Sequence, residues 1–310
     1  MIFPYDAAMT SPRSIALAAF LVACCGIALF SVMDAAMKGI ALAIGAYNAL
    51  LWRNVAGVVV SGGAYAMARS GWPSATVLRL HIWRGVIVAA MALLFFWSIT
   101  VLPLAEAIAL SFIAPLVALY LAAMLLGEKI SRAAILASLL GLAGVAVIMA
   151  GRLVSGPTGH SKDALWGVAA VLGSAVLYAY NLVLARQQAQ LAKPSEIAFF
   201  QTLTILVTLA FAAPWLADVP SRDLWPLILG AALLAVTSLH LLSWAYARAE
   251  AQVLIPVEYT AFIWAALCGW AFFDEALTWP VIGGAMLIVS GCLIAARAKP
   301  QPAQVEEIFA

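Results

Sequence analysis

Ten apolar stretches follow one another along this chain of 310 residues. Each is about 20 residues long, which is the length that an α-helix needs to cross the hydrocarbon core of a bilayer. Turn or charge signals separate them, such as Gly71, Trp72 and Pro73. The sequence therefore predicts an all-α membrane protein with ten transmembrane helices. These cover 14–38, 46–68, 80–102, 105–126, 133–151, 164–186, 195–215, 224–247, 252–273 and 279–297.

The composition excludes a soluble fold. Hydrophobic residues make up 66% of the chain and charged residues 10%, whereas soluble domains are about 45–50% apolar and about 25% charged. A soluble surface cannot hide that much apolar side chain, but lipid solvates it. The net charge of +2 does not indicate a nucleic-acid partner. The four cysteines lie in apolar stretches without histidine or carboxylate neighbours at metal-ligand spacing, so we expect no metal and no cofactor.

The distribution of lysine and arginine predicts the orientation. If the N-terminus is cytoplasmic, three basic residues fall in outer loops, namely Arg152, Lys162 and Arg222. Eleven fall on the cytoplasmic side: Arg13, Arg69, Arg79, Arg84, Lys129, Arg132, Arg186, Lys193, Arg248, Arg297 and Lys299. Cytoplasmic loops carry such an excess of positive charge. Both termini are therefore expected in the cytoplasm of a multi-pass protein in the bacterial inner (plasma) membrane.

The two halves of the sequence align with each other at a constant offset of 147 positions. This offset pairs Gly26 with Gly173, Asp34 with Asn181, Leu94 with Leu241, Trp97 with Trp244, Glu128 with Glu275, Ser131 with Thr278 and Gly144 with Gly291. We expect a first five-helix repeat at 1–151, a linker at 152–163, a second five-helix repeat at 164–299 and a cytoplasmic tail at 300–310. Five is odd, so the second repeat is inverted in the membrane. Inverted repeats are typical of transporters, although a duplication that only built a stable bundle is the alternative.

Two segments carry a family resemblance. The first runs from Pro115 to the sequence Leu-Leu-Gly-Glu-Lys-Ile-Ser that ends at Ser131, and the second runs from Pro256 to Thr278. With these segments the chain resembles the EamA-type branch of the drug/metabolite transporter superfamily, and within it the YddG aromatic amino acid exporters. The resemblance implies two five-helix repeats and export of aromatic amino acids. The second segment has Asp274 where the family has glycine before the glutamate.

Ionisable side chains inside the predicted spans are candidates for a substrate site, because burying charge in lipid is costly. Asp34 and Lys38 lie four residues apart toward the outer end of the first span, and Arg53 lies at a similar depth in the second. Asp34 is a predicted substrate-binding residue. An ion pair between Asp34 and Lys38 is the structural alternative.

The second half places its candidates toward the cytoplasmic side. They are Tyr178, Asn181, His240 and Glu258, of which Asn181 is the repeat partner of Asp34. Glu258 lies two residues after Pro256, and nothing nearby in the sequence neutralises it. A neutral core histidine is the alternative for His240.

Aromatic and proline residues complete the predicted site. Trp97, Trp244 and Tyr259 offer ring faces on which an amphipathic solute can stack, although packing against lipid is the alternative for each. Pro115 and Pro256 fall inside spans, where proline kinks a helix, and we predict them as hinges, with a passive kink as the alternative.

Two turns and several glycines have an architectural interpretation. Glu128 and Glu275 occupy equivalent turns, where a carboxylate can cap a helix N-terminus. Glycines in the fifth and tenth spans, Gly144, Gly283 and Gly284 among them, predict close helix packing.

The sequence has no phosphate-binding loop, no zinc-protease motif and no nucleophile elbow, so we do not expect an enzyme. The leading hypothesis is a secondary transporter that exports aromatic amino acids or related amphipathic metabolites by alternating access. Export of a purine, a polyamine or a cationic drug is the alternative, and a membrane enzyme or scaffold is a third. The expected partners are a small-molecule substrate and the lipid bilayer, and the sequence leaves monomer and dimer open.

Overall fold

The computed structural model describes residues 12–68, 71–114, 117, 120, 121, 132–154, 161–248, 257 and 260–297, apart from a few side chains within these ranges. Every regular element in this part of the chain is helical. The helices are α1 (Pro12–Met67), α2 (Ala75–Val101), α3 (Leu104–Ser111), α5 (Arg132–Val154), α6 (Ser161–Leu191), α7 (Pro194–Ala210), α8 (Ala213–Leu216), the 3-10 helix η2 (Arg222–Leu224), α9 (Trp225–Tyr246), α11 (Thr260–Phe273) and α12 (Trp279–Arg297).

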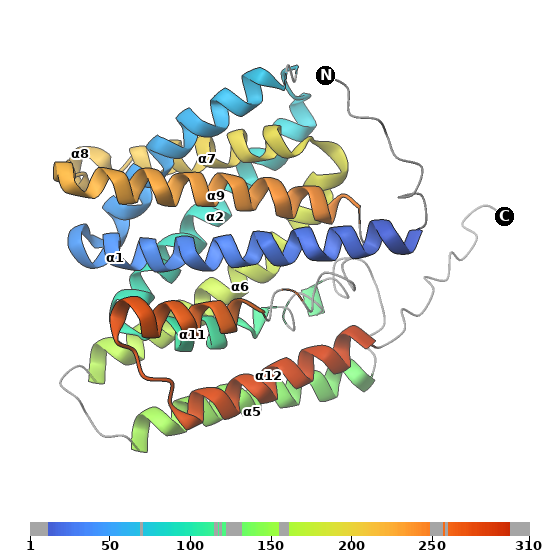
Figure 1. The fold of residues 1–310 in the computed structure, drawn as a ribbon, viewed down its shortest axis with the longest axis vertical. Helices are drawn as coiled ribbons and strands as arrows, with labels where there is room; N and C mark the ends of the chain where they lie inside the picture. Colours follow the sequence, from blue (N-terminus) through green and yellow to red (C-terminus); the bar gives the residue numbers. More distant parts are fainter. Residues whose placement is uncertain are drawn as a thin grey trace.

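The helix α1 is two rods joined at Gly45. This residue has φ 79° and ψ 155°, a backbone conformation that only glycine adopts without strain. Figure 1 shows the two rods in the blue part of the chain, joined by a tight turn. They correspond to the first two predicted spans. Four helical stretches are long and apolar enough to cross a membrane, namely Ala18–Met67, Ala75–Val101, Asp163–Leu191 and Arg222–Tyr246.

The described helices confirm an all-helical membrane protein, while the count of ten spans and the cytoplasmic termini stay predictions. Helices α7, α11 and α12 are shorter apolar helices. Their positions match the seventh, ninth and tenth predicted stretches. Residues 155–160 of the predicted linker and the whole predicted tail lie outside the described residues, while 152–154 belong to α5 and 161–163 to α6.

The helix contacts follow the repeat. At the offset of 147, the first rod of α1 corresponds to α6, its second rod to α7, α2 to α9, and α5 to α12. The most extensive interfaces join α1 to α9, α2 to α6, and α5 to α12. The contact of α1 with α9 is thus the counterpart of the contact of α6 with α2. Figure 1 shows α5 and α12 lying side by side at one edge of the bundle.

Two helices pack antiparallel against their own repeat copies. In the second rod of α1, Tyr47 donates a hydrogen bond to the carbonyl of Leu209 near the end of α7, while Ser61 meets Thr202, earlier in α7, at 2.9 Å. In α5, a Cβ on Gly144 would lie 2.5 Å from Ile288 of α12, while one on Gly151 would lie 2.3 Å from Pro280. Opposite insertion of the two repeats requires this arrangement.

The close approach of α5 and α12 depends on glycine at Gly144 and Gly284. A Cβ added at Gly144 would lie 2.5 Å from the carbonyl oxygen of Gly284, and one added at Gly284 would lie 2.5 Å from Ile148. Such distances leave no room for any side chain. Gly283, which the sequence also suggested as a packing residue, differs, because nothing lies within 4 Å of a Cβ placed there.

We expect Gly144→Val to destabilise the protein and Gly283→Val to have a small effect. The first change forces backbone apart, and overpacking of this kind costs about 1–3 kcal/mol. Gly283→Val changes the helix propensity in the same way, but the new side chain has free space around it. Thermal unfolding of the purified variants in detergent measures the difference. Equal melting temperatures for the two variants would show that α5 and α12 do not pack as described.

Candidate functional site

A cavity of about 250 Å³ lies inside the bundle, among α1, α2, α3, α6, α7, α9 and α11. Aromatic side chains form part of its wall, including Phe30, Phe95, Phe96 and Phe112. Its polar lining includes Asp34, Arg53, Asn54, Arg84, Asn181 and Gln201. A hollow with apolar walls and a few convergent polar groups is the usual form of a small-molecule site.

The two halves of the chain contribute equivalent positions to this cavity. Both members of each of these pairs, 147 positions apart, line it: Ser31 and Tyr178, Asp34 and Asn181, Asn54 and Gln201, and Phe96 and Ser243. A cavity that formed by chance in a bundle would not select matching positions in the two repeats. The position of the cavity therefore follows the correspondence between the two halves of the chain.

Arg53 brings a positive charge to the cavity. Its side chain is 8% exposed, and its guanidinium lies 5.6 Å from the centre of the Phe96 ring. Nη1 donates to the sulfur of Met33 at 3.4 Å, which is its only hydrogen bond to the described residues. The guanidinium interacts electrostatically with the carboxylate of Asp34, and no ion pair within 4 Å joins the two. Most of its N–H groups are therefore free to bind a ligand.

Two buried amide oxygens at the cavity have no hydrogen-bond partner among the described residues. They are Oδ1 of Asn54 and Oε1 of Gln201, which are repeat equivalents. Asn54 is 1% exposed, and its Nδ2 donates to the carbonyl of Leu50 at 2.8 Å. That bond fixes the amide so that the oxygen is the free atom. A buried oxygen without a donor is costly, so both atoms suit a ligand that carries N–H or O–H groups.

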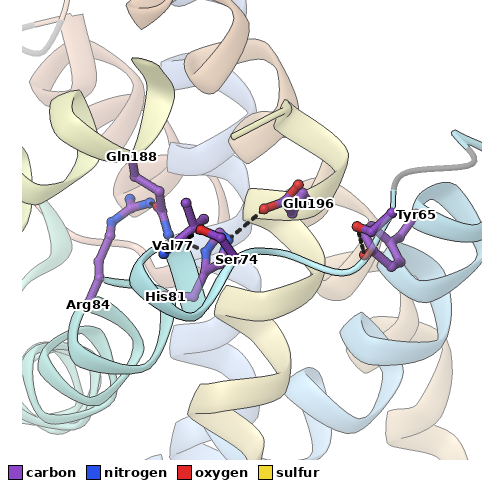
Figure 2. A network of polar contacts seen from close by, with 8 residues as sticks. Tyr65, Ser74, Val77, His81, Arg84, Gln188 and Glu196 are labelled. Carbon is purple, nitrogen blue, oxygen red and sulfur yellow. Dashed lines mark hydrogen bonds and ion pairs between the residues drawn. The ribbon is translucent and has the colours of Figure 1, made fainter. Parts of the chain in front are cut away.

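A chain of polar contacts begins at Arg84, which lines the cavity, and continues through Gln188, His81 and Glu196, which do not. Figure 2 shows these four residues. Arg84 donates from Nε to Oδ1 of Asn181 at 2.8 Å, and from Nη1 to Oε1 of Gln188. The Nε2 of Gln188 lies against Nδ1 of His81. The Nε2 of His81 lies 3.0 Å from Oε1 of Glu196. The chain thus connects α2 to α6 and α7.

This chain of contacts is deeply buried. His81 and Gln188 are 0% exposed, and Glu196, in the first turn of α7, is 9% exposed. The ring of His81 stacks on that of Phe200, with centroids 5.0 Å apart. Burial without partners would be prohibitive for these groups. The network therefore holds the starts of α2 and α7 and the end of α6 together.

A second buried charge pair joins Lys38 to Glu275. Lys38 forms a short contact with Oε1 of Glu275 and donates to the carbonyl of Leu102 at 2.9 Å. The other oxygen of Glu275 accepts from the backbone N–H of Leu104 at 2.8 Å, at the start of α3. The sequence interpretation of Glu275 as a capping residue agrees with this contact. The alternative of an ion pair between Lys38 and Asp34 is wrong, because the partner of Lys38 lies on the other half of the chain.

Asp274 has a role in presenting Glu275. Its φ of 51° lies in the left-handed region, where it is the one non-glycine residue among those described. Asp is among the few residues that tolerate this conformation. Asp274 therefore adopts the left-handed conformation that a glycine at this position would allow, and the turn before Glu275 is retained.

The structure brings three of the predicted site residues together. Asp34, Tyr178 and Asn181 line the cavity. Trp97, His240 and Trp244 are not among its lining residues. Trp97 is 41% exposed, Nδ1 of His240 lies 2.8 Å from the carbonyl of Val236 in its own helix, and Trp244 stacks with Arg248 at 4.2 Å.

The other predicted residues cannot be placed. Glu258, Tyr259 and the hinges Pro115 and Pro256 lie outside the described residues, so their roles stay predictions. The described part of the chain contains no group of three or more His, Cys, Asp or Glu side chains that could hold a metal ion.

Sequence reasoning missed two polar residues of the cavity, Asn54 and Gln201, and the members of the network that supports it: Arg84, Gln188, His81 and Glu196. The sequence analysis counted Arg84 among the basic residues of the cytoplasmic side and did not consider it as a site residue, although it lies inside the span predicted at 80–102. The cavity extends to this residue, in the N-terminal half of α2. The spacing of His81 and Arg84, three residues apart on one helix face, was the available signal.

Comparisons with known proteins give a consistent result. The model of the EamA-like transporter family matches residues 165–297. A pseudopaline exporter of Pseudomonas aeruginosa is 27% identical over 87% of this chain and 93% of its own length. An uncharacterized transporter of Helicobacter pylori is 30% identical over 68% of this chain and 71% of its own length.

More distant similarity points the same way. A riboflavin transporter of Brucella anthropi is 25% identical over 70% of this chain and 76% of its own length. A solved crystal structure aligns with 89% of this chain and 96% of its own, with a TM-score of 0.62 at 20% identity, which shows a shared fold.

We expect Lys38→Met and Glu275→Gln each to lower the free energy of unfolding by about 3 kcal/mol, because each leaves a buried charge without its partner. The double variant should lose clearly less than the sum. Unfolding of the four proteins in detergent measures this coupling. Lys38→Met combined with Asp34→Asn is the control: these two residues are neighbours on one helix, so their coupling should be small but measurable, and clearly weaker than the coupling of Lys38 to Glu275. Stronger coupling to Asp34 than to Glu275 would contradict the pairing.

Proposed function

We infer the function from the family: this chain belongs to the EamA-like transporter family, so it is a membrane transporter with a small-molecule substrate. We propose that it is a secondary transporter in the bacterial inner membrane. It exports aromatic amino acids or related amphipathic metabolites by alternating access around the central cavity. Its resemblance to aromatic amino acid exporters is part of this proposal.

The observation that carries the proposal is the cavity lined by matching positions of both repeats. In alternating access, two oppositely inserted repeats rock against each other and expose one site to each side in turn. The solute then has to lie where both repeats meet. Asp34 with Asn181, and Asn54 with Gln201, supply such shared positions.

The chemistry of the lining fits a solute with a polar head and an apolar body. Arg53 offers N–H donors for a carboxylate, and charge-assisted bonds of this kind are the strong ones. The carboxylate of Asp34 and the free oxygens of Asn54 and Gln201 can accept hydrogen bonds from an ammonium group. Phe95 and its neighbours supply apolar and ring contacts. Together these groups match a zwitterionic aromatic amino acid.

Export of another metabolite is the alternative. The pseudopaline exporter and the riboflavin transporter show that relatives act on different metabolites. Two guanidinium groups and one carboxylate line the described cavity, which disfavours a polyamine or a cationic drug by like-charge repulsion. A membrane enzyme or a scaffold would need no solute to cross the bilayer, so the absence of flux for a broad metabolite panel would favour it.

We expect proteoliposomes that contain this protein to move labelled tryptophan or phenylalanine faster than empty liposomes. Flux should saturate with substrate concentration, since a site with few binding positions fills. Liposomes that contain the heat-denatured protein are the control for leakage. Flux equal to that of empty liposomes for both amino acids would reject the aromatic amino acid assignment and leave the other metabolite classes to be tested.

Arg53→Gln should weaken binding of tryptophan by about tenfold or more, because a hydrogen bond to a charged group contributes about 1.5–3 kcal/mol. Tryptamine, which lacks the carboxylate, should bind the variant no more weakly than the wild type. Arg222→Gln is the matched control, since Arg222 lies in an exposed turn. Equal loss for both solutes would show that Arg53 supports the structure and does not bind the carboxylate.

A further inference from the structure

We propose that solute binding in this protein is coupled to a proton that binds at His81, and that Gln188 transmits this event to Arg84 at the cavity. The proposal deepens the proposed function, since Arg84 lines the same cavity. It assigns a second ligand, the proton, to a buried site outside that cavity. The argument starts from which groups in the network can donate a hydrogen bond and which can accept one.

Arg84 fixes the direction of every bond in this network. Arginine has donors and no acceptor, so Gln188 must present its oxygen to Arg84. Its amide nitrogen then faces Nδ1 of His81, as Figure 2 shows. The Nδ1 atom is therefore an acceptor and carries no hydrogen. The proton of the neutral ring is on Nε2, which donates to the carboxylate of Glu196 at 3.0 Å.

A second proton on His81 is incompatible with the bond between Gln188 and Arg84. The new N–H at Nδ1 would point at the N–H of the Gln188 amide. If the amide turns over, its oxygen accepts from His81, but its nitrogen then faces the N–H of Arg84. Either orientation brings two donors together. A charged His81 and an Arg84 bonded to Gln188 therefore exclude each other.

The charges around His81 make protonation feasible and consequential. Glu196 on α7 can form an ion pair with the charged ring. Arg84, on the same helix as His81, repels it, and among the described side chains of α6 the neutral Gln188 faces the ring. On α1, Tyr65 lies near Glu196 and interacts with its charge. Phe200 covers one ring face. The pair of Arg84 and Glu196 is neutral overall, and the added proton leaves one uncompensated positive charge.

This extra charge links the proton to the solute. Once Gln188 turns to His81, Arg84 keeps its Nε bond to Asn181, and its terminal nitrogens are free to face the cavity. A carboxylate that Arg53 binds there would also attract the released guanidinium, and its negative charge would balance the added proton. Two ligands that each favour the same state increase each other's affinity reciprocally. Proton binding at His81 and binding of a carboxylate-bearing solute therefore support each other.

The first test measures binding of L-tryptophan to the protein in lipid nanodiscs by calorimetry. Buffers with different ionisation enthalpies give the number of protons taken up. Affinity should rise about tenfold between about pH 8 and about pH 5.5, with proton uptake. His81→Gln should abolish both effects. Wild-type binding without pH dependence or proton uptake would overturn the proposal, as would pH dependence that persists in His81→Gln.

Gln188→Glu separates the switch from a structural role. A carboxylate at this position can accept from His81 and Arg84 at once, so His81 should still gain a proton while Arg84 stays bound. The variant should therefore fold and bind tryptophan with little dependence on pH. Unchanged pH dependence in this variant would contradict transmission through Gln188.

The second test needs no solute. The chain has three histidines, so ring-nitrogen NMR signals of His81 can be assigned by substitution of the other two. At about pH 8 the ring should be the Nε2–H tautomer. The side-chain amide signals of Gln188 should shift with the same midpoint as His81 when the pH falls. The Nδ1–H tautomer at about pH 8, or Gln188 amide signals that do not change as His81 titrates, would contradict the proposal. Absence of tryptophan binding at every pH, with the NMR result as expected, would reject the substrate and not the switch.

Discussion

The bundle is organised by the cost of burying charge. A buried ion without a partner is strongly destabilising, and the described helices meet this cost by pairing residues that lie far apart in the sequence. Lys38 of the first repeat binds Glu275 of the second, and His81 on α2 binds Glu196 on α7. These pairs fix the relative positions of helices whose apolar surfaces alone carry little directional information. Arg53 and Asp34 differ from these pairs. They face a cavity, and no ion pair joins them to another described residue.

The sequence predicted the parts of this fold that depend on length and repetition. The positions of the helices follow from runs of apolar residues, and the constant offset identified Asp34 and Asn181 as equivalent, which both line the cavity. Tyr178 was placed there as well. The reason is that span length and repeat offset are properties of the chain itself and do not depend on how the helices are rotated.

The sequence could not predict which face of each helix turns inward. In a soluble helix the apolar face identifies the core, but in lipid both faces are apolar. Trp97 and Trp244, which are repeat partners, were therefore expected near the solute and lie outside the lining. For the same reason Arg84, which was counted only as a basic residue of the cytoplasmic side, was not expected to line the cavity. The pairing of Lys38 with Glu275 was equally hidden, since it joins residues 237 positions apart.

The repeat is symmetric in position and asymmetric in charge. Both arginines of the cavity lie in the first half, and their equivalents 147 positions later are Phe200 and Ala231. Asp34 is matched by the neutral Asn181. The second half thus contributes neutral polar groups such as Gln201, while the first contributes the charges. Phe200 also packs on His81, so the position equivalent to Arg53 supports the network that holds Arg84. The shape of the cavity thus follows positions that match at the offset of 147, while its charge follows a few buried residues that differ between the two halves.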